Sequence, residues 1–231
     1  MERFLPIFLI IGWFGTVFAS SYLINWLLVR SVIRKYYRFF VAPGVLVHEL
    51  SHALGCMATG AQIIEINFWK KTGGHVRHYE PQVPIIGETV IALAPIGGTF
   101  LFLAIFTRLM VPSLAELLGT ESMLDLNSLS KIGWSKWQTW TYLYLVTSLL
   151  ATIAPSQTDL RYAIASLLAI GSVFVLLSFL PFVPPLLLGW FKTIKPFALF
   201  TLLLLLLGIV ISFVLAIPYR NRTFSPKEQL D

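Results

Sequence analysis

Long apolar runs separated by short polar segments make up most of the chain. A bilayer core of about 30 Å is crossed by about 20 helical residues. Lipid offers the backbone no hydrogen-bond partners, so only helices and closed barrels cross it. These runs lack the short alternation of apolar and polar residues that is typical of barrel strands. The pattern predicts an all-α polytopic membrane protein with about six transmembrane helices. The runs are residues 4–29, 37–57, 85–111, 137–154, 162–182 and 197–217.

Six spans leave little room for a separate soluble domain. We therefore predict one integral membrane domain over residues 1–231, ending in a polar tail at residues 219–231. The first run continues well past a possible signal-peptide cleavage site near Ser20, so we interpret it as a retained anchor.

Composition supports a membrane location. The chain is 57% hydrophobic and only 12% charged, which is outside the usual range of soluble globular proteins. Its net charge of +6 comes from basic residues beside the apolar runs, so lipid headgroups are favoured as the partner over nucleic acid.

A single cysteine excludes an internal disulfide and a multi-cysteine metal site. A metal in this chain would need histidine and carboxylate ligands.

Two of the four histidines lie together inside the second apolar run, in the sequence His48-Glu49-Leu50-Ser51-His52. Positions i and i+4 share one face of a helix, so both imidazoles can reach one metal ion. Glu49 can then lie beside a water molecule bound to that ion. An acid at the centre of a membrane helix costs roughly 2.5–3.5 kcal/mol, and such residues are functional candidates. The alternative is a set of buried polar groups that join neighbouring helices.

A catalytic zinc site usually has three protein ligands, so a third is needed. Glu88 and Asp159 are the acids closest to membrane depth. Asp159 follows Pro155, which interrupts two apolar runs, and its carboxylate is placed to fold back towards a metal. Ser156 and Asp159 also fit a capping box, and both roles remain open for Asp159. For Glu88, a plain first-turn acid is favoured.

The His48-Glu49-x-x-His52 pattern in an apolar segment, followed by a glycine-containing loop and a distant Asp near a helix break, resembles the site-2 protease family of intramembrane zinc metalloproteases. The resemblance covers roughly residues 37–165, the expected catalytic core. It implies that His48, His52 and Asp159 bind Zn²⁺ and that Glu49 is the general base. It also implies that the substrates are transmembrane proteins.

Two further segments carry the resemblance. The sequence TGGHVRHYEP, residues 72–81, is placed where the family has a hairpin that pairs with an extended substrate strand. This implies a short hairpin-like loop after the metal helix, with Gly73, Gly74 and His75 as substrate-binding residues. The sequence ALAPIGGTF, residues 92–100, is similar to the family's helix beside the active site, although Ala94 stands where glycine is usual. With no PDZ domain, the chain is similar to a compact, divergent branch.

Three functions are compatible with these residues. The first is a zinc-dependent intramembrane endopeptidase, in a multi-pass membrane protein of the cell membrane if the source is prokaryotic. The second is another zinc hydrolase of the membrane that acts on loops or termini. The third is a non-catalytic metal-binding membrane protein. The sequence carries no signal for an oligomeric state.

Overall fold

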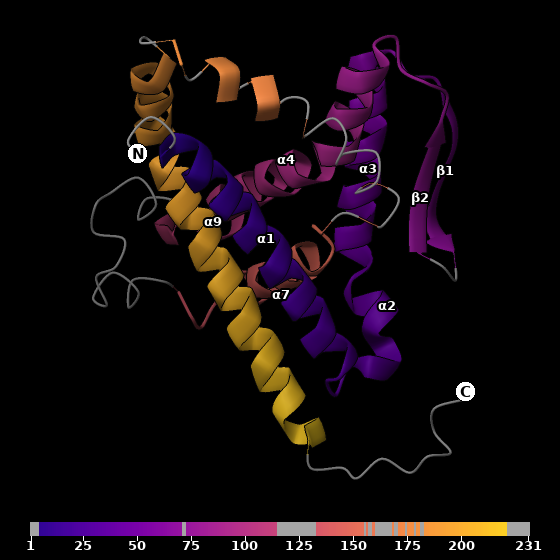
Figure 1. The fold of residues 1–231 in the computed structure, drawn as a ribbon. Coiled ribbons are helices and arrows are strands. Elements are labelled where there is room, and N and C mark those ends of the chain that lie inside the picture. The colour runs from indigo at the N-terminus through magenta and orange to yellow at the C-terminus, as the bar shows by residue number, and fades with distance from the viewer. Residues whose placement is uncertain are drawn as a thin grey trace.

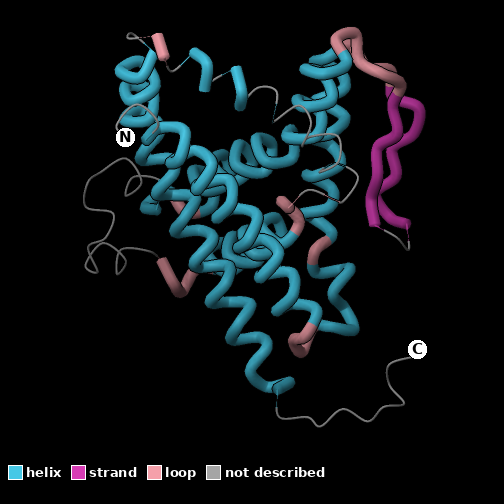
Figure 2. The backbone as a smooth tube through the Cα atoms, in the orientation of Figure 1, coloured by secondary structure: helices cyan, strands magenta, loops and turns pink. Residues whose placement is uncertain are grey.

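Helices dominate the computed structural model, with one strand pair standing beside them (Figures 1 and 2). The structure describes residues 5–70, 73–114, 133–154, 156, 159, 168, 171–173, 175–177, 179–180 and 183–220. The helices are α1 (Leu5–Val29), α2 (Tyr37–Phe40), α3 (Ala42–Thr59), α4 (Pro84–Met110), α7 (Trp137–Ala151) and α9 (Val183–Arg220), and the strands are β1 (Ile63–Lys70) and β2 (Gly73–His78).

Three helical stretches are long and apolar enough to cross a membrane: Phe8–Val29, Ile86–Met110 and Ala198–Ile217. A fourth is added if the bent pair Arg34–Phe40 and Ala42–Thr59 counts as one span. This is consistent with a membrane protein. Helix α7 has only 15 residues, and most of the run at 162–182 falls outside the described residues. The expectation of about six spans therefore stays a prediction.

The second apolar run is bent. Helix α2 ends at Phe40, and α3 begins at Ala42 after a bend of 41°. Pro43 lies in the first turn of α3, where a backbone N–H has no helical partner, so proline removes no hydrogen bond there. Its fixed φ also matches the helix. Helix α3 ends at Thr59, and the next residue, Gly60, has a φ of 70°, the left-handed conformation that glycine adopts readily. The chain then turns directly into β1.

A core of apolar side chains joins α1, α4, α7 and α9. Helices α1 and α9 lie side by side along the bundle (Figure 1), and the Trp13 indole N–H donates to Thr201 Oγ1 across them at 2.8 Å. Burying these side chains stabilises the bundle and holds α7 against α3. The fully buried members of this core include Val17, Ile24, Leu28, Leu103, Val146, Leu149 and Leu150.

Small residues let α3 approach its neighbours closely. A Cβ on Gly98 of α4 would collide with Ser51 Oγ, and a Cβ on Gly55 would lie 3.0 Å from Ile91 Cα. From Ser51 to Gly55 along α3, the contact moves backwards along α4 from Gly98 to Ile91. The two helices therefore pack antiparallel. On the α7 side, the Gly44 N–H belongs to the first turn of α3 and lacks a helical partner, so it donates to Ser148 Oγ at 3.2 Å.

Strands β1 and β2 form an antiparallel pair beside α3 (Figure 1). Ile66 pairs with Val76, and Lys70 pairs with Gly73. The two glycines that the sequence places near a turn, Gly73 and Gly74, are the first residues of β2. The base of the pair packs on a small cluster around Cys56 at the contact between α3 and α4.

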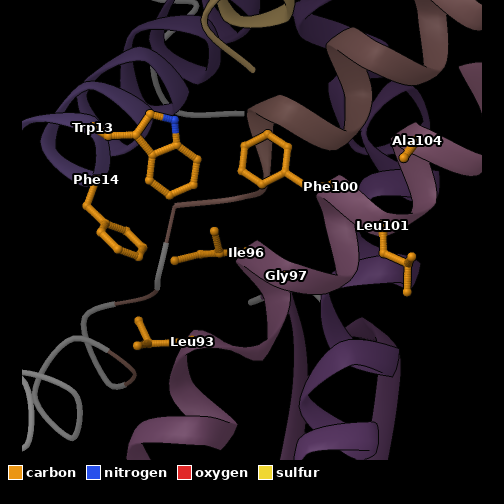
Figure 3. Close-up of a pocket in the computed structure, with 8 residues that line it drawn as sticks. All are labelled: Trp13, Phe14, Leu93, Ile96, Gly97, Phe100, Leu101 and Ala104. Carbon is orange, nitrogen blue, oxygen red and sulfur yellow. The ribbon is translucent and has the colours of Figure 1, made fainter. Parts of the chain in front are cut away.

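An apolar cavity of about 430 Å³ lies between α1 and α4 (Figure 3). Trp13 and Phe14 line one side, and Leu93, Ile96 and Phe100 are among the residues of α4 that line the other. Among the described residues, no histidine or acid borders it, so it is separate from the polar site described next.

Candidate metal centre

His48 and His52 face each other from successive turns of α3. Both are buried, and their Nε2 atoms are 3.2 Å apart. The rings meet edge to face, with centroids 4.8 Å apart and planes at 76°. The helical i, i+4 spacing thus brings two ligand nitrogens to one point, as the sequence pattern predicts.

Asp159 completes the group. Its Oδ2 lies 3.6 Å from His52 Nε2 and 3.9 Å from His48 Nε2. Helix α7, which packs on α3, ends at Ala151, so the chain that follows it starts close to these histidines. Within the described part of the chain, His48, His52 and Asp159 are the one group of histidine, cysteine and acid side chains able to hold a metal ion.

The triangle of ligand atoms has the size of a metal site. Its sides are 3.2, 3.6 and 3.9 Å. A tetrahedral zinc ion with bonds of about 2.0–2.1 Å separates its ligand atoms by about 3.3 Å. Small movements of the side chains would therefore let all three atoms reach one ion.

Asp159 also makes two hydrogen bonds with Ser156. The backbone N–H of Ser156 donates to Asp159 Oδ2 at 2.9 Å, and the backbone N–H of Asp159 donates to Ser156 Oγ at 3.1 Å. These reciprocal bonds are those of the capping box that the sequence predicts, and Asp159 also belongs to the group that could hold a metal ion. Burial alone would raise the pKa of the Asp159 carboxyl, but His52 and the hydrogen bonds with Ser156 lower it to about 2. At neutral pH the side chain is an anion, as a metal ligand must be.

The other ring nitrogen of His52 is held by the backbone of α4. His52 Nδ1 donates to the Ile91 carbonyl oxygen at 2.8 Å, and because a carbonyl only accepts, Nδ1 carries the proton. In the neutral ring, Nε2 is then the nitrogen with the lone pair, and it lies 3.2 Å from His48 Nε2 and 3.6 Å from Asp159 Oδ2. Metal-binding histidines usually donate their second N–H in this way.

Glu49 lies beside the group without belonging to it. It is buried, and its Oε2 makes no hydrogen bond to any described residue. Strand β2 covers it from the other side: a Cβ on Gly74 would lie 2.6 Å from both Cγ and Oε1 of Glu49. Burying a carboxylate oxygen without a hydrogen bond costs solvation free energy. Oε2 of Glu49 is therefore available to bind a proton or to accept a hydrogen bond from water.

The other two histidines and Glu88 are not part of the group of three. His75 Nε2 is 3.6 Å from Glu65 Oε1 on the strand pair, and His78 Nδ1 donates to the Tyr79 carbonyl at 2.9 Å. Glu88 is absent from the metal group. The Ile91 carbonyl was not among the predicted site groups, because every residue type carries a backbone acceptor.

No family model, curated protein or solved structure that we compared with this chain matches it.

Proposed function

We propose that the protein is a zinc-dependent intramembrane endopeptidase of the site-2 protease type. It hydrolyses peptide bonds of transmembrane protein substrates. The observation that carries this proposal is the triangle of His48, His52 and Asp159 with Glu49 next to it on the same apolar helix.

The donor set suits Zn²⁺. Two imidazole nitrogens and one carboxylate oxygen are ligands that zinc accepts, and three protein ligands leave a fourth position open, as in catalytic sites. A zinc ion held there supplies Lewis-acid chemistry, polarising a carbonyl and lowering the pKa of water towards about 7.

Glu49 is the general base in this proposal. Its free Oε2 accepts a proton from the attacking water and later returns that proton to the leaving amine. A carboxylate can do this only if it is close to the reacting atoms and not occupied as a ligand. Two observations support this role: Glu49 is not in the metal group, and its Oε2 is buried without a hydrogen-bond partner among the described residues.

The strand pair is the proposed substrate platform. A transmembrane helix hides its carbonyls in its own hydrogen bonds, so the substrate has to be extended before attack. Extended peptides bind by adding a strand to an exposed edge. Because β2 passes directly over Glu49 at Gly74, a strand bound there runs past the general base. Gly73, Gly74 and His75 are the residues we expect to contact it.

The whole chain forms one multi-pass membrane domain in this proposal, with about six spans and a catalytic core at residues 37–165. The bilayer and a transmembrane protein substrate are its partners. If the source is prokaryotic, its location is the cell membrane.

Membrane proteomics with Glu49→Gln in the native host tests the function. We expect at least one full-length membrane protein to accumulate in the variant and its shorter fragment to disappear, relative to wild type. Glu80→Gln makes the same chemical change at an exposed site and should leave both levels unchanged. Identical membrane proteomes in the Glu49→Gln and wild-type cells would contradict the proposal.

Gly74→Ala should slow cleavage of that substrate by about 10²-fold, since a misplacement of about 1 Å at a reacting site costs this much. The new methyl group would lie 2.6 Å from Glu49 Cγ, so the strand or the base has to move. Zinc content should not change, because the contact is with Glu49 and not with a ligand. Gly97→Ala is the control, since its methyl group meets nothing within 4 Å. Equal cleavage rates in the two variants would show that β2 does not hold Glu49 in place.

A further inference from the structure

Helix α4 contains a proline in its interior, Pro95, four residues after Ile91. A helix proline has no N–H, so it cannot donate to the carbonyl four residues earlier, and its ring pushes that carbonyl away from the helix axis. The carbonyl freed by Pro95 is that of Ile91. Proline is tolerated inside a membrane helix where a neighbouring group satisfies the freed carbonyl.

The neighbouring group here is His52. Its Nδ1–H donates to Ile91 O at 2.8 Å, across the contact between α3 and α4. The two helices approach each other closely around this bond, because Gly98 faces Ser51 on one side and Gly55 faces Ile91 on the other. Both Pro95 and Ile91 are buried, so water does not offer the carbonyl an alternative partner.

We infer that Pro95 is a positioning residue for the metal centre: by removing one helical hydrogen bond, it reserves the Ile91 carbonyl for His52. The bond holds the proton on Nδ1 and leaves Nε2 as the ligand nitrogen. With any other residue at 95, a backbone N–H would donate to Ile91 O and draw the carbonyl back along the helix. His52 would then share its acceptor or lose it.

The inference rests on the proposed metal site but not on protease activity. It concerns the orientation and tautomer of one histidine, so it is measurable without any substrate. Only four histidines are present, and their ring nitrogens can be followed together in ¹⁵N-histidine-labelled protein.

The test compares Pro95→Ala with Pro84→Ala in the detergent-purified full chain. Pro84 lies at the start of α4, where the backbone N–H has no helical partner, so its replacement alters no acceptor. We expect the zinc Kd, measured by competition with a chelator, to rise about 10- to 100-fold in Pro95→Ala, the usual effect of losing an outer-shell partner. Pro84→Ala should stay within about twofold of wild type.

NMR of the metal-free protein gives a second readout that does not depend on zinc. At a pH where the ring is neutral, wild-type His52 should be the Nδ1–H tautomer, because Nδ1 donates to Ile91 O. In Pro95→Ala, the Nε2–H tautomer should gain population, whereas a merely structural role for Pro95 would not change the tautomer. Wild-type zinc affinity and an unchanged His52 tautomer in Pro95→Ala would overturn the inference. Wild type that binds no zinc would overturn it as well. If both readouts respond to Pro95 but no cleavage depends on Glu49, the proposed function fails and the positioning role stands.

Discussion

Replacing both His48 and His52 with alanine is expected to abolish zinc binding by the purified protein. The two side chains supply two of the three ligand atoms, and Asp159 alone is left. Four-ligand zinc sites have binding free energies of about 10–16 kcal/mol, so two ligands correspond to about 5–8 kcal/mol. This lowers the affinity by roughly 10⁴-fold or more. Elemental analysis after dialysis measures the zinc content per chain and so tests this prediction.

The chain provides a matched control for this experiment. His75 and His78 are its other two histidines, and both lie on β2. Their double replacement by alanine should leave zinc content unchanged. If that variant lost the ion and the His48/His52 variant kept it, the metal site would lie on the strand pair and not on α3.

Glu49→Gln should lower the rate of peptide hydrolysis by about 10²- to 10⁴-fold, the usual contribution of general acid–base catalysis. Glutamine has nearly the same shape but does not accept a proton from water at neutral pH. Because Glu49 is not among the three ligands, zinc stoichiometry should stay the same. The decisive measurement is a single-turnover rate on the purified variant, with zinc content determined on the same sample.

Two outcomes would contradict the role of Glu49. A variant that keeps zinc and cleaves at the wild-type rate would exclude it as the general base. A variant that loses zinc would make it a ligand instead. The exposed Glu80→Gln, with the same loss of one negative charge, should behave as wild type in both measurements.

The sequence predicted some of the helices and the facing histidine pair, because both depend on neighbouring residues. Apolar length and the i, i+4 spacing are properties of neighbouring residues, so α1, α4 and the His48–His52 arrangement follow from short stretches of chain. Asp159 was identified from a proline break, and its distance to the histidines depends on how α7 packs on α3. Its two possible roles could not be ranked without that packing.

Other features depend on contacts that the sequence does not display. The bend at Val41 interrupts a run that looks continuous in hydrophobicity, since Val41 is itself apolar. The contact of Gly74 with Glu49 joins a strand to a helix, and either residue alone has several explanations. The Ile91–His52 bond involves a backbone carbonyl, so only the position of Pro95 four residues later points to it.

X-ray absorption at the zinc edge of the purified full chain tests the metal centre most directly. We expect about one zinc per chain with about four nitrogen or oxygen neighbours at about 2.0–2.1 Å, two of them imidazoles, and a change in this signal when Asp159 is replaced by alanine. A sulfur neighbour at about 2.3 Å, or protein that takes up no stoichiometric metal, would contradict a site made by His48, His52 and Asp159.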